Sequence, residues 1–232
     1  MHQTLSVLLK LVSLLRLTVV HCCSRNTNLL NKKKFLRKRV PLSIGCWNVR
    51  TLLDRVGSGR PERRTALVTS ELHRLNLDIV ALSETRLSGE DQLAEVSSGY
   101  SIFWCGKPVN VKREGGVGFA IKSSLLEKIE QPHGISDRVM KLRIPLACGR
   151  FLSIISVYAP TLQASNEVLN SFYSCLSETV RNIPKEEKVI VLGDFNSRVG
   201  NDHETWSVLG QYGVGKMNNN GLRLLDFCTQ PF

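Results

Sequence analysis

The feature that most restricts the fold of this chain is a short apolar run, Val-Ile-Val-Leu at residues 189–192, which leads directly into Gly-Asp-Phe-Asn. A β-branched run of this length that ends at a glycine predicts a buried strand. Asp194 and Asn196 then follow its carboxyl end, where α/β folds gather reacting groups, and alternate positions of an extended chain point to one side. A carboxylate can bind a metal ion or accept a proton, and a carboxamide can donate to a phosphate. An Asx-turn after a strand has the same sequence pattern.

Three further apolar runs deliver a polar group near their end in the same way. The first carries Asn48, the second delivers Glu84, and the third ends in Tyr158 before Ala-Pro. Packing of the strands against a core explains the apolar runs, but it does not explain why each run has a polar residue near its end. Four strands that each present a polar group at the carboxyl end therefore predict one site assembled from several strand ends.

The remaining sequence predicts helices that alternate with strands and strand pairs. Strands are expected at residues 42–47, 79–82, 100–105, 116–121, 139–144, 151–158 and 189–192. Helices are expected at residues 60–76, with Pro61 in the first turn, at 163–182 and from 221 to 228. The glycine-containing segment 112–118 lacks the Gly-Lys-Ser/Thr ending of a phosphate loop and is predicted as a hairpin turn. The alternation indicates an α/β protein with a mixed sheet.

The first 40 residues differ from the rest, and we expect a poorly ordered extension over 1–40 and one domain over 41–232. Residues 5–20 are rich in leucine and valine but are interrupted by Lys10 and Arg16. This stretch is too short and too charged for a transmembrane helix and lacks the features of a signal peptide. An amphipathic basic helix is the alternative.

The net charge of the chain is +11, which favours a polyanionic partner. Six of the positive charges lie in the basic run 32–39, and removing these six leaves +5, so the predicted domain is only mildly basic. The run itself predicts nuclear import, phosphate contact or an ordinary solvated charge cluster. The seven cysteines form no Cys-x-x-Cys pair, which favours reduced thiols and an intracellular protein.

Four motifs occur in the order and approximate spacing of one known superfamily. They are Trp-Asn at 47–48, Ser-Glu-Thr-Arg at 83–86, Tyr-Ala-Pro at 158–160 and Gly-Asp-Phe-Asn at 193–196. With them, the chain resembles the endonuclease/exonuclease/phosphatase superfamily from about Leu42 to its last residue. The longer matches, among them Leu-Ser-Glu-Thr-Arg and Asn-Gly-Leu-Arg-Leu-Leu-Asp-Phe-Cys, resemble the endonuclease domains of non-LTR retrotransposons and the craniofacial development protein 2-like proteins.

This resemblance implies an α/β fold, namely a four-layer α/β/β/α sandwich of the DNase I-like type. The superfamily also carries late strands, a further aspartate and a Ser-Asp-His motif. No Ser-Asp-His occurs in the 232 residues, so we expect a sandwich that is incomplete at its C-terminus.

The resemblance further implies an endonuclease that hydrolyses DNA phosphodiester bonds with Mg²⁺ or Mn²⁺. Glu84 and Asn48 match the metal-binding positions. Asp194, Asn196 and Tyr158 match the catalytic ones: Asp194 would orient or deprotonate the attacking water, and Tyr158 would donate to the phosphate.

DNA is the expected partner, and neither a small-molecule cofactor nor stable membrane insertion is expected. The side chains expected to contact DNA are Arg50, Arg86, Lys32, Lys33 and Lys34. One alternative is an inactive nucleic-acid-binding or remnant domain, because a missing catalytic group commonly costs orders of magnitude in rate. A more distant alternative is a phosphatase that acts on small phosphate esters. The sequence leaves the oligomeric state open.

Overall fold

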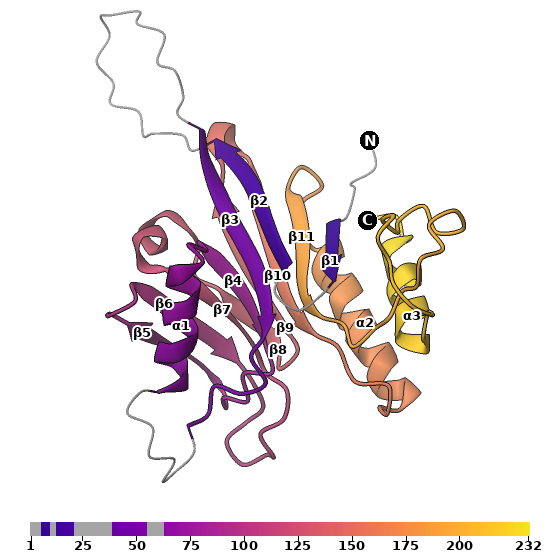
Figure 1. Ribbon diagram of the computed structural model, residues 1–232, viewed down its shortest axis with the longest axis horizontal. Coiled ribbons are helices and arrows are strands. Elements are labelled where there is room, and N and C mark those ends of the chain that lie inside the picture. The colour runs from indigo at the N-terminus through magenta and orange to yellow at the C-terminus, as the bar shows by residue number, and fades with distance from the viewer. Residues whose placement is uncertain (1–5, 10–12, 21–38, 55–62) are drawn as a thin grey trace, which may run out of the picture.

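Two stacked β-sheets with helices on their outer faces make up this protein (Figure 1). The computed structural model describes residues 6–9, 13–20, 39–54 and 63–232. The strands are β1 (Ser6–Leu9), β2 (Ser13–Val20), β3 (Arg39–Asn48), β4 (Ile79–Ser83), β5 (Glu90–Glu95), β6 (Tyr100–Cys105), β7 (Val117–Lys122), β8 (His133–Ser136), β9 (Val139–Pro145), β10 (Phe151–Tyr158) and β11 (Lys188–Asp194). The helices are α1 (Arg64–Arg74), α2 (Asn166–Arg181) and α3 (Asn219–Cys228), with short 3₁₀ turns at Ser123–Lys128 and Ala147–Gly149.

Each sheet contains a parallel pair of strands joined by a helical crossover. One sheet has the order β2-β3-β4-β7-β6-β5, in which β3 and β4 are parallel and α1 connects them. The other has the order β1-β11-β10-β9-β8, in which β10 and β11 are parallel and α2 connects them. A parallel pair puts two carboxyl ends side by side. Asn48 is therefore in register with Ser83, and Tyr158 with Asp194.

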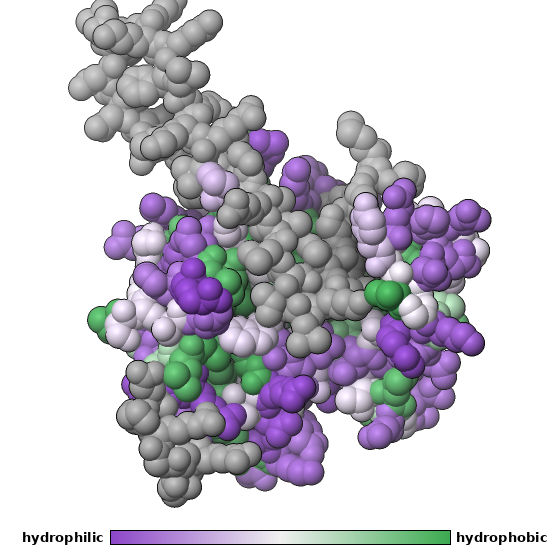
Figure 2. All heavy atoms as spheres, in the orientation of Figure 1, coloured by the Kyte–Doolittle hydropathy of each residue, from purple (hydrophilic) through white to green (hydrophobic). Residues whose placement is uncertain are grey.

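Three apolar clusters hold the layers together. The central one joins the inward faces of both sheets and includes Ile44, Phe119 and Ile154. A second lies between α2, α3 and one sheet, and a third lies between α1 and the other sheet. The layer order is thus helix, sheet, sheet, helices, which confirms the predicted α/β/β/α sandwich. Hydrophilic side chains cover most of the described surface in the view of Figure 2, with apolar ones in a few patches between them.

The elements predicted from apolar periodicity are present, and their ends differ from the prediction by four residues or fewer. The first turn predicted for α1, residues 60–62, lies outside the described residues. Strands β5 and β8 were not predicted. Both lie at sheet edges, and β5, with the sequence Glu-Asp-Gln-Leu-Ala-Glu, is largely exposed. An edge strand with charged side chains lacks the apolar pattern of a buried one.

Two segments within the first 40 residues are strands. β1 pairs with β11, and β2 pairs antiparallel with β3. The structure gives these two segments as strands and not as the amphipathic helix that the sequence offered as an alternative. The expectation of a poorly ordered extension over residues 1–40 stays a prediction. The basic run up to residue 38 lies outside the described residues, and the domain boundary near residue 40 stays a prediction. No helix in the described part of the chain is long and apolar enough to span a membrane.

Tyr100 offers a test of the packing between α1 and its sheet. Its side chain is 0% exposed, and its hydroxyl donates to the carbonyl oxygen of Leu77 and lies 3.1 Å from that of Leu72. Tyr100→Phe leaves two buried carbonyls without this donor and is expected to lower the free energy of unfolding by about 1–3 kcal/mol. Urea unfolding measures this change, and Tyr212→Phe, at a side chain 93% exposed, is the matched control.

The same residue predicts a pH dependence of stability. Burial, with the nearby charge of Asp78, raises the pKa of Tyr100 from 10.0 to about 12. Because the folded pKa is the higher one, the contribution of Tyr100 is complete below pH 10 and is lost as the pH rises toward 12. Alkaline unfolding that is equally steep in wild type and Tyr100→Phe contradicts this assignment.

Candidate active site

Polar side chains from four strand ends meet at one edge of the sandwich. Asn48 ends β3, Glu84 follows β4, Tyr158 ends β10 and Asp194 ends β11. The structure therefore brings together the groups that the sequence predicted to share a site, from both sheets.

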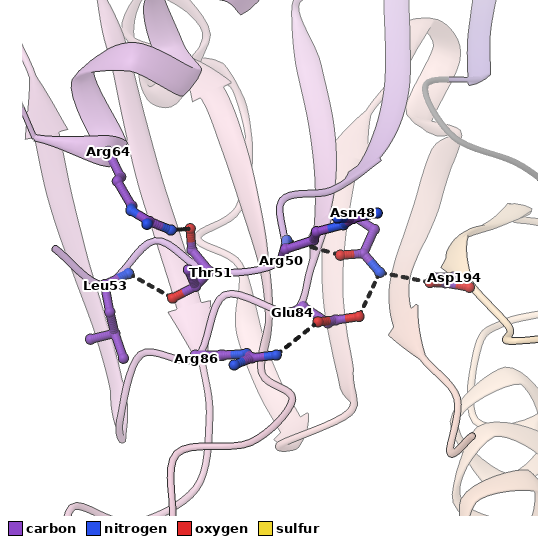
Figure 3. A network of polar contacts seen from close by, with 8 residues as sticks. All are labelled: Asn48, Arg50, Thr51, Leu53, Arg64, Glu84, Arg86 and Asp194. Carbon is purple, nitrogen blue, oxygen red and sulfur yellow. Dashed lines mark hydrogen bonds and ion pairs between the residues drawn. The ribbon is translucent and has the colours of Figure 1, made fainter. Parts of the chain in front are cut away.

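The side-chain amide of Asn48 connects the two sheets at this edge. Its Nδ2 donates to Oε1 of Glu84 at 2.8 Å and to Oδ2 of Asp194 at 2.7 Å (Figure 3). Its Oδ1 accepts the backbone N–H of Arg50 at 2.9 Å, and this bond sets the orientation of the amide. Both amide hydrogens are thus used by carboxylates, and the oxygen faces away from them. Ligation of a metal ion would need the amide oxygen, which does not face the carboxylates here, and the role of Asn48 as a metal ligand stays a prediction.

Four residues of the site have a left-handed backbone, which side chains other than glycine seldom adopt. Their φ angles are 60° at Arg50, 56° at Glu84, 56° at Arg86 and 47° at Asn196. Each such residue costs on the order of 1–3 kcal/mol and persists only where its surroundings hold it. Clusters of this kind are typical of functional sites.

The turn before β7 holds the backbone around Glu84. The carbonyl of Gly116 accepts the N–H of Thr85 at 3.2 Å, and that of Gly115 accepts the N–H of Arg86 at 2.9 Å. Gly116 has φ +84°, and a Cβ there would overlap Oγ1 of Thr85. The segment is part of the loop over residues 106–116 that joins the antiparallel strands β6 and β7, so the predicted hairpin connection is present but is longer than a tight turn. The backbone of this loop binds the backbone next to Glu84.

The end of β11 is shaped by a glycine and an Asx-turn. Gly193 has φ +145°, and a Cβ there would overlap the carbonyl oxygen of Val157 on the neighbouring strand. Oδ1 of Asp194 accepts the N–H of Asn196 at 2.9 Å, so the Asx-turn and the site coexist. Both residues lie at the end of the predicted strand, but the extended backbone expected to point their side chains the same way does not continue to Asn196. Asn196 has a left-handed backbone, and its Nδ2 donates to the carbonyl of Ala159 at 2.8 Å.

Tyr158 is 8% exposed, and its hydroxyl interacts with the Glu84 carboxylate and the Asn196 amide. Burial raises the pKa of Tyr158 above its usual 10.0, as do the charge and hydrogen bond of Glu84 and the charge of Asp194, while the Asn196 bond opposes them. The phenol therefore keeps its proton at neutral pH and can donate it in a hydrogen bond.

Arg138 is a residue of this region that the sequence did not single out. Its Nη1 donates to the carbonyl oxygen of Tyr158 at 3.1 Å, and its guanidinium lies 5.3 Å from the centre of the Tyr158 ring. Arg138 immediately precedes β9, which runs antiparallel to β10, so its position at the site edge follows from strand pairing. No local sequence pattern carries that information.

The basic residues predicted to contact DNA lie at the rim or outside the described residues. Arg50 and Arg86 are exposed. Nη2 of Arg86 lies 3.4 Å from Oε2 of Glu84, and an ion pair this exposed to solvent contributes little to stability. The remaining three, Lys32, Lys33 and Lys34, lie outside the described residues.

The donor set of the site fits a hard cation that keeps much of its water. No group of three or more histidine, cysteine, aspartate or glutamate residues suited to a metal occurs in the part of the chain that the structure describes. The two carboxylates, Glu84 and Asp194, converge on one neutral amide. Mg²⁺ commonly binds through one or two carboxylates together with water and substrate phosphate, whereas structural zinc needs four protein ligands.

Comparisons with known proteins agree with this architecture. The Endonuclease/Exonuclease/phosphatase family profile matches residues 45–224. The chain is 31% identical over 187 residues to craniofacial development protein 2 of Tragulus javanicus and 30% identical over 187 residues to that of Bos taurus. These alignments cover 80% of this chain but only 30% and 29% of the two relatives. The chain thus spans less than a third of the length of these curated relatives.

One solved structure illustrates the shared fold. The crystal structure of the AP endonuclease LMAP from Leishmania major superposes with a TM-score of 0.50 at 15% sequence identity. The match covers 67% of this chain and 55% of that chain. At such low identity the similarity concerns the fold alone.

Tyr158 is expected to ionise only above pH 10, since burial and the neighbouring carboxylates oppose a phenolate. The ultraviolet absorbance of wild type minus that of Tyr158→Phe, followed against pH, gives the titration of this one phenol. A midpoint at or below pH 10 contradicts the described environment of the hydroxyl.

Proposed function

The chain belongs to the endonuclease/exonuclease/phosphatase family, and we propose that its site hydrolyses DNA phosphodiester bonds with Mg²⁺ or Mn²⁺. Family membership supports an activity of the nuclease or phosphodiesterase type. The observation that carries the proposal is the convergence of Glu84 and Asp194, from different sheets, on the amide of Asn48. DNA as the substrate is part of the proposal.

The carboxylate of Glu84 would hold the metal ion. Asn48 would orient Glu84 and Asp194 through its two N–H bonds, instead of ligating the ion itself. When bound, the ion would supply positive charge to a phosphoryl oxygen and to the leaving group. Asp194 would orient the attacking water or accept its proton.

Two further side chains would contact the phosphate. Tyr158, a phenol whose pKa is raised further above neutral pH by burial, would donate to a phosphate oxygen as negative charge develops. Asn196 lies beside this hydroxyl and would hold the phosphate or the water by its amide. The guanidinium of Arg138, which touches the Tyr158 carbonyl, adds a positive charge on the same side. Arg50 and Arg86, at the exposed rim, would contact the DNA backbone.

A second candidate is a domain that binds nucleic acid without hydrolysing it. The observation in its favour is that Arg50 and Arg86 are exposed at the rim of the site, where they can contact a phosphate backbone. A nuclear location is a proposal that rests on the basic run 32–39 in the sequence.

Nicking of supercoiled plasmid tests the proposed hydrolysis. Glu84→Gln and Asp194→Asn remove one carboxylate each, and each is expected to lower the rate by about 10²- to 10⁴-fold, because charge stabilisation or base catalysis is lost. EDTA is expected to abolish nicking. Glu127→Gln, at an exposed carboxylate in the 3₁₀ turn after β7, is the matched control and should nick like wild type.

The outcomes separate the candidates. Nicking that persists in both site variants contradicts the assigned roles. Absence of nicking by folded wild-type protein, with plasmid binding retained, supports the binding-only domain. Release of phosphate from a small monoester without plasmid nicking supports a phosphatase.

Metal binding is tested separately by thermal unfolding. Mg²⁺ at 100 times its dissociation constant is expected to stabilise the wild-type protein by about 2.7 kcal/mol, because the ion binds the folded state only. Glu84→Gln is expected to lose this stabilisation, and Glu127→Gln to keep it. Equal stabilisation of all three proteins would place the bound ion away from Glu84. NaCl of matched ionic strength controls for screening.

A further inference from the structure

The segment Asn-Asn-Asn-Gly at residues 218–221 fastens the start of α3 to the loop after β11. Oδ1 of Asn218 caps the helix by accepting the N–H of Gly221 at 2.8 Å and also accepts the N–H of Arg198 at 3.0 Å. The backbone N–H of Asn218 donates to the carbonyl of Arg198 at 3.0 Å. A Cβ at Gly221 would overlap that carbonyl oxygen, so a side chain larger than glycine would separate helix and loop.

Asn220 lies inside this junction and is 1% exposed. Its Nδ2 donates to the carbonyl of Pro160 at 3.0 Å and to that of Asn196 at 3.1 Å. These carbonyls belong to the loops that follow β10 and β11. One buried amide therefore joins the two loops that follow Tyr158 and Asp194.

The oxygen of the Asn220 side-chain amide lacks the hydrogen bonds that its nitrogen makes. Its Oδ1 is buried and has no hydrogen-bond partner among the described residues. A buried acceptor without a partner costs on the order of 1–3 kcal/mol, so an apolar side chain would serve packing better. An amide at this buried position is explained by the two hydrogen bonds that its nitrogen donates to the loops.

Asn196 is held from several directions by these contacts. Its N–H is bound by Asp194, its side chain donates to Ala159, and its carbonyl accepts from Asn220. The last bond fixes the peptide that follows a left-handed residue with φ 47°. Without it, the loop is free to relax toward a more favourable backbone angle and to move the Asn196 amide away from Tyr158.

We propose that Asn220 is a positioning residue that holds Asn196 in register with Tyr158 for phosphate contact. This inference rests on the proposed hydrolysis. Asn220 touches neither substrate nor metal and acts through the carbonyls of Asn196 and Pro160.

A double-mutant cycle tests this role. Asn220→Ala is expected to lower kcat for nicking on the order of 10- to 100-fold, because a misplaced group costs rate even when it is not lost. KM for DNA is expected to stay within about threefold, since DNA contacts elsewhere are unchanged. In the Asn196→Ala background, Asn220→Ala should cost little more, because the group that it positions is gone. Fully additive losses overturn the proposal.

Two further variants separate positioning from folding. Asn219→Ala, an exposed residue of the same type at the start of the same helix, should keep wild-type kcat. If Asn220→Ala does not fold, Asn220→Ser takes its place, because it keeps a polar side chain with one hydrogen-bond donor at this buried position. An intermediate kcat for Asn220→Ser is expected, and a wild-type kcat overturns the proposal.

Nuclear magnetic resonance gives a readout that does not need activity. The side-chain amide signal of Asn196 is expected to shift or broaden in Asn220→Ala or Asn220→Ser and to stay unchanged in Asn219→Ala. An unchanged Asn196 signal in the Asn220 variants overturns the inference. Wild-type protein that does not nick DNA refutes the proposed function instead, while the amide signal still decides whether Asn220 holds Asn196.

Discussion

The nitrogen of one amide, Nδ2 of Asn48, holds two carboxylates from different sheets at a single point, and the site depends on this contact. Like charges repel, and a neutral donor with two hydrogens offsets that repulsion without cancelling the charge. What remains is a pair of negative groups in fixed positions, an arrangement suited to a divalent cation. The two crossovers through α1 and α2 make the contact possible, because each places a parallel pair of strand ends at the same edge.

The loops around Asn48 are held in place by hydrogen bonds from other segments of the chain. Glu84 and Asn196 both have left-handed backbones, and each is bound by a neighbouring segment: the turn before β7 in the first case and the start of α3 in the second. The unfavourable backbone conformations of the two loops thus persist because hydrogen bonds to the rest of the sandwich offset their cost in free energy. Strain held in this way keeps side chains fixed before a substrate arrives, which is the condition for electrostatic catalysis.

The sequence predicted the buried strands and the four meeting groups because both depend on local pattern, an apolar run followed by a polar residue. The family predicted from four short motifs is confirmed by the profile match. Edge strands such as β5 were missed because their exposed faces are polar. The two carboxylates that Asn48 binds and the positions of Arg138 and Asn220 depend on which distant segments become neighbours, and no run of adjacent residues encodes that.

The most direct measurement of the central claim is paramagnetic broadening by Mn²⁺ in the amide spectrum of the protein. If Glu84 holds the cation beside Asn48 and Asp194, substoichiometric Mn²⁺ will first remove the side-chain signal of Asn48 and the backbone signals of the two acids. Signals from the exposed 3₁₀ turn around Glu127 will persist, and Glu84→Gln will abolish the selective loss. Broadening that is uniform, or that is centred on another part of the chain, would contradict the account.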